Sequence, residues 1–263
     1  MVAATVLLAP LDVASAPPAS QPIRPALRAR VALSVGAPNA GRLVRGEKLE
    51  PSTLIRIVPA WGGPDFRWGL PQLVGMLRRA AAKVSNVHGD AKMCVGDLSS
   101  RTGGTLRKHK SHQSGRDADI GFYMLNARGE PIYHHRFVAF DAEGRSSELP
   151  GARFDDARNW TLIESLLQDP EARVQWVFVS DALRTRLLRE AERRGASRQL
   201  RLRAARVMKE TKGSSHDDHF HVRIDCPKDQ RGTCEPWPRR VTQSSQPATR
   251  AGAQRGKRGK RRR

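Results

Sequence analysis

Five of the eight histidines of this chain fall in two short windows of the sequence. The first window runs from His109 to Asp119, and the second runs from His216 to His221. Imidazole nitrogens and carboxylate oxygens hold zinc in a catalytic geometry, in which three protein ligands leave one position open for water. Histidines scattered at random do not group in this way, so the spacing predicts a catalytic metal site.

Strand periodicity predicts how these side chains come together. Residues 219–224 alternate between polar and apolar types, which is typical of a strand, and side chains two positions apart share one face of a strand. His219 and His221 should therefore point to the same side. Residues 118–124 form a second expected strand, on which Asp119 faces away from the apolar side chains.

If these two strands are neighbours, His112, Asp119 and His221 converge on one point. His112 precedes Asp119 by seven residues, and Gly115 between them permits a turn. Zinc at this point would lower the pKa of its bound water and polarise a carbonyl group. His219 would stand beside the water as a general base or as an oxyanion-stabilising group. Four more side chains are candidates to orient the ligands: His109, His216, Asp217 and Asp218.

A structural zinc site and a chance grouping are the alternatives to a catalytic metal. Structural sites usually use cysteine or four closed ligands, and neither histidine window contains a cysteine. The remaining histidines lack the spacing of ligands, and we interpret them as surface or packing residues: His88, His134 and His135.

Hydrophobic periodicity predicts strands and helices in an order without regular β–α–β alternation, which favours an α+β architecture. The expected strands cover 54–58, 118–124, 136–140, 174–179 and 219–224. The expected helices cover 71–84, 159–167, 181–194 and about 199–209, with Asp181 as the cap of the third helix and Gly195 as its end.

Composition divides the chain into three regions. Residues 1–45 resemble an export leader followed by a linker rich in Pro, Ala and Arg, with Ala14-Ser15-Ala16 as a possible cleavage site. The leader lacks a basic start, which a start codon assigned too far downstream would explain. Residues 46–240 form the expected folded domain, and residues 241–263 form a disordered basic tail. The apolar run at the start is too short to span a bilayer.

The net charge of +21 predicts attraction to a polyanion. Nucleic acid, an anionic lipid surface and an anionic envelope polymer all fit the charge. The tail alone carries eight Lys or Arg residues and no acidic residue. Aromatic residues make up only 5 % of the chain and no nucleic-acid motif is present, which disfavours a nucleic-acid-binding module.

The three cysteines lie outside the histidine windows. Cys226 and Cys234 flank a short polar loop, and this spacing is compatible with a disulfide or with two free thiols. Cys94 lies between apolar residues and is interpreted as a buried small hydrophobic side chain rather than a nucleophile.

Several stretches resemble the penicillin-insensitive murein endopeptidases, within the lysostaphin/D-Ala-D-Ala metallopeptidase group. The resemblance covers about residues 46–235 and is carried by Arg67-Trp68-Gly69 through Leu73, Val95-Gly96-Asp97-Leu98-Ser99, His109-x-Ser111-His112-Gln113-x-Gly115-x-Asp117-x-Asp119-Ile120, Arg158-Asn159-Trp160 and His216-x-x-His219-x-His221-Val222-Arg223.

This resemblance implies a periplasmic zinc enzyme that cleaves D-alanyl–meso-diaminopimelyl cross-links of peptidoglycan. It implies zinc at His112, Asp119 and His221, a place near the metal for His109, and supporting or catalytic roles for His219 and His216. It also implies an antiparallel central sheet that carries the site, which is flanked by helices, and a Cys226–Cys234 disulfide. The Arg-rich composition, the basic tail and the small number of cysteines depart from the family pattern.

Three other functions compete with this hypothesis. A D,D-carboxypeptidase or dipeptidase on the same scaffold would need a more closed cleft. A basic nucleic-acid-binding module would explain the charge but not the histidines. A degenerate wall-binding protein is disfavoured, because every expected ligand is present. The basic tail would suit an anionic envelope polymer as a partner in any of the wall-directed hypotheses.

Overall fold

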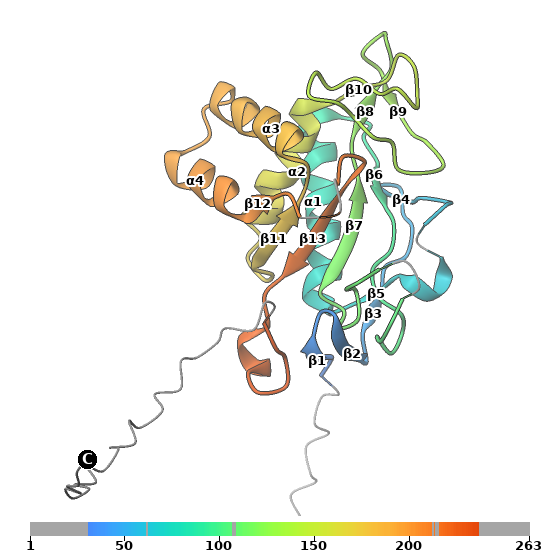
Figure 1. Cartoon of the computed structure of the whole chain (residues 1–263), viewed down its shortest axis with the longest axis vertical. Coiled ribbons are helices and arrows are strands. Elements are labelled where there is room, and N and C mark those ends of the chain that lie inside the picture. Colours follow the sequence, from blue (N-terminus) through green and yellow to red (C-terminus); the bar gives the residue numbers. More distant parts are fainter. Residues whose placement is uncertain (1–30, 62, 107–108, 212, 214–215, 237–263) are drawn as a thin grey trace, which may run out of the picture. The chain divides into compact units, whose positions relative to one another are not determined.

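The computed structural model describes residues 31–61, 63–106, 109–211, 213 and 216–236 (Figure 1). The chain divides into two units, and every helix and strand of the described residues lies in the unit 32–263. Within the described residues, no helix is both long enough and apolar enough to cross a bilayer. The expected leader and basic tail lie outside the described residues, so both stay predictions.

A six-stranded sheet forms the centre of the folded unit (Figure 1). The strands run in the order β12 (Met208–Lys209), β11 (Val174–Phe178), β13 (His219–Ile224), β7 (Asp117–Gly121), β6 (Met93–Val95) and β4 (Ile55–Ile57). Among the described residues there are four α-helices: α1 (Pro71–His88), α2 (Asp156–Leu167), α3 (Asp181–Arg193) and α4 (Arg198–Val207). The predicted α+β class is confirmed.

The sheet is mixed, which corrects the expectation of an antiparallel sheet. Its inner pairs β11–β13, β13–β7 and β7–β6 are antiparallel, but the outermost pairs β4–β6 and β11–β12 are parallel. The connections between the strands explain this difference. Along the chain, α1 comes between β4 and β6, and α3 and α4 come between β11 and β12. A crossover through a helix returns the chain to the same end of the sheet, so the next strand runs parallel.

The helices cover one face of the sheet. Ile120 of β7 and Phe220 and Val222 of β13 are fully buried in the same core cluster as the apolar stripe of α1. Because side chains alternate along a strand, the residues between them face the opposite side. His219, His221 and Asp119 therefore share the face that the helices leave open, as the alternation in the sequence predicted.

Helix boundaries follow local capping chemistry. α1 begins with Pro71 at its first position and ends before Gly89, which has a φ of 72°. It is therefore four residues longer than predicted. The side chain of Ser180 caps α3 by accepting a hydrogen bond from the Leu183 amide, so Asp181 is the first residue of the helix and not its cap. Gly195 follows the end of α3 with a φ of 69°.

Two predicted strands differ in the structure. β7 ends at Gly121, and Met124 belongs to β8 (Met124–Leu125), which pairs with β9 (Pro131–Ile132) and β10 (Arg153–Phe154). The segment 136–140 is irregular rather than a strand. Its apolar alternation arises because Phe137 and Phe140 enter two different apolar clusters, and not because they line a ladder.

The folded region begins earlier than residue 46. β1 (Leu33–Ala37) and β2 (Ala40–Val44) form an antiparallel hairpin where the sequence predicted a linker. The amide of Ser34 donates to the Gln230 side chain at 2.8 Å, and Gly36 bridges to Cys234. These contacts across the chain order a segment whose composition alone resembles a linker.

Short elements complete the fold. β3 (Glu47–Lys48) pairs with β5 (Trp68–Gly69), and two 3-10 turns cover Pro64–Phe66 and Lys228–Gln230. Cys226 and Cys234 form a disulfide, which confirms the family-based expectation, and Cys94 is free and buried as predicted. Burial raises the pKa of the Cys94 thiol to about 11, which argues against a nucleophilic role.

We predict that Leu162→Ala destabilises the protein by about 2–5 kcal/mol, because Leu162 is fully buried in α2 and its removal leaves a cavity in the main core. Leu202→Ala on α4 is the matched control, because Leu202 is 58 % exposed and should change stability by less than about 0.5 kcal/mol. Urea unfolding measures both, and equal effects would contradict the assigned core.

Candidate metal centre

Asp119 of β7 lies at the centre of the histidine cluster. Its carboxylate is buried, with 2 % of the residue exposed. One oxygen, Oδ1, lies 3.2 Å from Nε2 of His112, 3.5 Å from Nε2 of His219 and 3.7 Å from Nδ1 of His221. The other, Oδ2, lies 3.7 Å from Nδ1 of His109. The two windows of the sequence therefore meet at one carboxylate.

The first-window histidines are each held by a group behind them. Nδ1 of His112 donates to the backbone carbonyl of Leu98 at 2.6 Å, and Nε2 of His109 donates to the carboxylate of Asp97 at 2.8 Å. Because a carbonyl oxygen only accepts, Nδ1 of His112 carries a proton and Nε2 is left as the possible ligand atom. Such outer hydrogen bonds fix the tautomer and the orientation of metal-binding histidines.

The second-window histidines have the same arrangement. Nε2 of His221 donates to Asp117 at 2.8 Å, and Asp117 also accepts a hydrogen bond at 2.6 Å from Nε of Arg223. Nδ1 of His219 pairs with Asp218 at 2.5 Å. In both rings the remaining nitrogen is directed toward Asp119. All four imidazoles thus have one fixed nitrogen and one that faces the centre.

Two buried atoms at the centre fit a cation. Nε2 of His112 and Oδ1 of Asp119 are both inaccessible, and neither has a hydrogen-bond partner among the described residues. A lone pair and a carboxylate oxygen 3.2 Å apart repel each other unless a proton or a metal ion lies between them. The donor set of imidazole and carboxylate suits Zn²⁺.

Three of the four residues predicted at the metal form a compact group among the described residues. Possible ligand atoms of His109, His112 and Asp119 lie within 4.8 Å of one another, and the fourth predicted residue is His221. His221 approaches the same carboxylate oxygen to 3.7 Å. The ring centroids of His112 and His221 are 4.6 Å apart, and those of His109 and His112 are 4.3 Å apart. The rings of His109 and His221 are thus both neighbours of the His112 ring.

Charge and burial shift the titration of the cluster in opposite directions. Burial opposes ionisation of Asp119, but His112 and His219 outweigh it and hold the pKa of the carboxyl well below its usual range. Burial likewise opposes the charge on His219, but Asp119 and Asp218 raise its pKa to about 10. Asp119 also raises the pKa of His112 against burial. Burial dominates at His221 and lowers its pKa to about 4.

His216 lies at the edge of the cluster. Its ring is 5.3 Å from that of His219 and 5.8 Å from that of His221, and its Nδ1 is 3.3 Å from the hydroxyl of Thr211. His112 and His216 both adopt positive φ values, 68° and 42°. Such backbone conformations cost energy in residues with a Cβ and concentrate at functional sites.

Gly115 shapes the loop that presents His112. It has a φ of 72°, and a Cβ at this position would come within 2.6 Å of the Leu43 side chain. Leu43 belongs to β2, so the N-terminal hairpin packs against the loop between His112 and β7. The hairpin, which the sequence analysis had interpreted as a linker, is therefore part of the support for the site.

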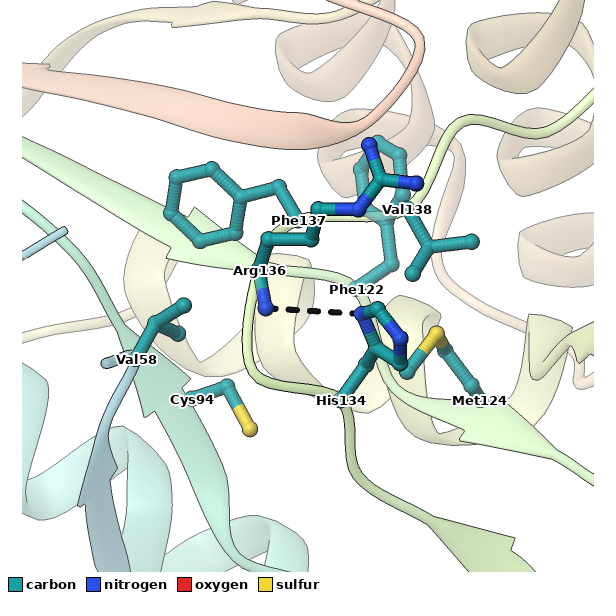
Figure 2. Close-up of a pocket in the computed structure, with 9 residues that line it drawn as sticks. Val58, Cys94, Phe122, Met124, His134, Arg136, Phe137 and Val138 are labelled. Carbon is teal, nitrogen blue, oxygen red and sulfur yellow. Dashed lines mark hydrogen bonds between the residues drawn. The ribbon is translucent and has the colours of Figure 1, made fainter. Parts of the chain in front are cut away.

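Aromatic rings form one wall of the cluster. The Phe137 ring stacks on the His219 ring with 4.8 Å between their centroids. The Trp61 ring stacks in turn on Phe137, with 5.9 Å between those centroids. A Cβ on Gly96 would lie 2.5 Å from the Phe137 ring, so only glycine leaves room for it. A small pocket borders Phe137, between Val58, Cys94 and the irregular 133–138 segment (Figure 2).

Some residues of the cluster were predicted from the sequence, and others were not. Asp218 was expected to orient a ligand, and it contacts His219. Asp97 and Asp117 were not assigned a role, although Asp117 shares a strand face with Asp119, which is a signal visible in the Asp-x-Asp spacing. The histidines interpreted as packing residues form other contacts: His88 with Thr161, and His134 with His135.

Fold and site define the general class, an α+β protein with a buried histidine–aspartate cluster able to bind a metal ion. The chain matches the family model described as penicillin-insensitive murein endopeptidase over residues 64–247. It therefore belongs to the penicillin-insensitive murein endopeptidase family, as the resemblance in its motifs predicted.

Curated relatives carry the same description. A penicillin-insensitive murein endopeptidase of Haemophilus influenzae is 29 % identical over 164 residues, which make up 62 % of this chain and 53 % of that protein. One from Escherichia coli K12 is 30 % identical over 172 residues, or 65 % of this chain and 58 % of that protein. The chain thus spans somewhat more than half of the length of these relatives.

The raised pKa of His219 has a testable consequence. In chelator-treated protein His219 should titrate near pH 10, because the Asp119 carboxylate stabilises its cationic form. Because folding raises the pKa of His219, protonation of this residue stabilises the folded protein. The full stabilisation is present at pH values below 6.5, the ordinary pKa, and it is lost as the pH rises through about 10. Zinc should lower the His219 pKa, because it neutralises Asp119. NMR titration measures both states, and an equal pKa with and without zinc would contradict a shared centre.

Proposed function

We propose that this protein is a zinc-dependent murein endopeptidase that hydrolyses D-alanyl–meso-diaminopimelyl cross-links of peptidoglycan. The observation that carries the proposal is the convergence of four oriented imidazoles on the buried Asp119 carboxylate. Family membership supports peptidoglycan as the substrate class, because the relatives are described as murein endopeptidases.

Zinc would be held by His112, Asp119 and His221, with His109 close beside it. The unpartnered nitrogen of His112 and oxygen of Asp119 support this assignment, because a cation satisfies both buried atoms. When bound, zinc supplies a Lewis acid that polarises the scissile carbonyl and makes water a nucleophile near neutral pH. The Leu98 carbonyl would keep His112, and the Asp117 carboxylate would keep His221, in the tautomer that can bind metal.

His219 and His216 would serve the proton transfers. His219 has Nδ1 fixed by Asp218, and its Nε2 faces the centre 3.5 Å from Asp119. It can accept a proton from the attacking water or stabilise the developing oxyanion. His216, beside both His219 and His221 and held by Thr211, would support this orientation.

We further propose that the protein acts in the periplasm after export. Its cross-linked substrate lies outside the cytoplasm, and the Cys226–Cys234 disulfide suits an oxidising compartment. We also propose that the chain consists of an export leader, a folded domain and a basic tail, and that the folded domain includes the hairpin that begins at residue 33. The tail would attract an anionic envelope polymer, because its eight cations have no acidic neighbours.

Zinc binding can be tested ligand by ligand. His112→Ala, Asp119→Ala and His221→Ala should each lose the metal, measured by elemental analysis of purified protein. His109→Ala should retain zinc with roughly 10- to 100-fold weaker affinity, the usual effect of a supporting group. The exposed His135 gives the control His135→Ala, which should bind zinc like the wild type. Full loss in His109→Ala together with full occupancy in His221→Ala would exchange the roles of these two residues.

Digestion of purified cross-linked muropeptides, with products identified by mass spectrometry, tests the reaction itself. The wild type should release the monomers expected from cleavage between D-alanine and diaminopimelate, and chelation should abolish this activity. His219→Ala should keep zinc but lose about 10²–10⁴-fold in rate, as expected for general acid–base help. Removal of a terminal D-alanine without cross-link cleavage would favour the carboxypeptidase alternative.

A further inference from the structure

A continuous row of side chains crosses four strands on the open face of the sheet. Lys209 of β12 pairs directly with Phe178 of β11, Phe178 with His221 of β13, and His221 with Asp119 of β7. Residues directly opposite one another on neighbouring strands share a face of the sheet. Lys209 is therefore on the same face as the candidate metal centre. It lies two strands from His221, and neighbouring strands are about 4.8 Å apart.

Aromatic rings hold the Lys209 side chain in place. Its ammonium nitrogen lies 3.3 Å from the centroid of the Trp176 ring and 5.6 Å from that of Phe178. The Phe178 ring in turn lies 5.1 Å from the imidazole of His221. A lysine in contact with two aromatic rings has less rotational freedom than one in solvent, so its charge has a defined position beside the metal ligands.

The Lys209 charge has no carboxylate partner in the part of the chain that the structure describes. Arg223, its cationic neighbour on the same face, differs because it is paired with Asp117. Burial and then the charge of Arg223 lower the pKa of Lys209, which is the expected effect of a cation whose charge is poorly compensated. Lys209 is only half-buried and can still meet a ligand from the open face.

We propose that Lys209 binds a carboxylate of the peptide substrate, and so selects cross-links with a free acid beside the scissile bond. This inference rests on the proposed function. An extended peptide advances about 3.3–3.6 Å per residue, so a group reaching Lys209 lies within about three residues of the metal centre. The diaminopimelyl residue of the proposed substrate carries a free carboxylate next to the amide nitrogen of the cross-link, and Lys209 supplies its counter-charge.

Two cross-linked muropeptides that differ only in this carboxylate, free or amidated, test the proposal. The wild type should prefer the free acid by roughly 10- to 100-fold in kcat/KM, the range of a charge-assisted hydrogen bond. Lys209→Met should abolish the preference, mainly through a higher KM for the free acid, because the contact exists before and during the reaction. Lys209→Arg should restore most of it. Lys83→Met on the exposed side of α1 is the control.

Calorimetric binding of the same two peptides to the zinc-loaded protein separates this proposal from the proposed function. If neither peptide is hydrolysed but the free acid binds more tightly in a Lys209-dependent way, the reaction is wrong and the carboxylate site stands. If cross-links are cleaved but the wild type shows no preference, Lys209 is not the selecting group. An equal loss for both peptides in Lys209→Met, with a lowered unfolding temperature, would assign Lys209 a structural role and also overturn the proposal.

Discussion

A buried carboxylate that must be compensated is the constraint on which the rest of this site depends. Asp119 has lost nearly all contact with water, and a desolvated negative charge is costly unless cationic or polar groups surround it. Four imidazoles fill that role, and each is fixed from behind by an acceptor, as with His112 on the Leu98 carbonyl. The arrangement retains two buried atoms at its centre that have no hydrogen-bond partner in the described part of the chain, a pattern that a structure built only for stability would avoid.

Strand register converts this local constraint into a property of the whole sheet. The pairing of His221 with Asp119 and of Arg223 with Asp117 places two members of the histidine–aspartate cluster in one row and their supporting ion pair in the next. The residues between them, such as Phe220, fill the helix-covered core. A slip of one residue between β7 and β13 would turn every one of these side chains to the wrong face, so core packing and the site specify the same register.

The sequence predicted what depends on periodicity and composition, and failed where distant contacts decide. His219 and His221 on one strand face follow from alternation alone, and α1 follows from its apolar stripe and Pro71. The hairpin at 33–44 could not be predicted, because its order comes from contacts with Gln230 and Cys234, nearly two hundred residues away. The parallel edge pairs were missed for a related reason, since helix crossovers are visible only once the strand neighbours are known. The place of His109 near the site was expected only from the family resemblance, and its contact with Asp97 is one that no spacing rule reveals.

Aromatic side chains border the histidine–aspartate cluster on two sides and strengthen the interactions between its charges. On one side Phe137 stacks on His219, and on the other Phe178 packs edge-on against His221. Rings at these positions reduce the exposure of the imidazoles to water, and interactions between charges strengthen as the local dielectric constant falls. The same low dielectric strengthens the attraction between Asp119 and its imidazoles, and it raises the cost of the Lys209 charge, which has no carboxylate partner among the described residues. One row of the sheet thus sets the distance between the buried Asp119 carboxylate and the Lys209 ammonium group.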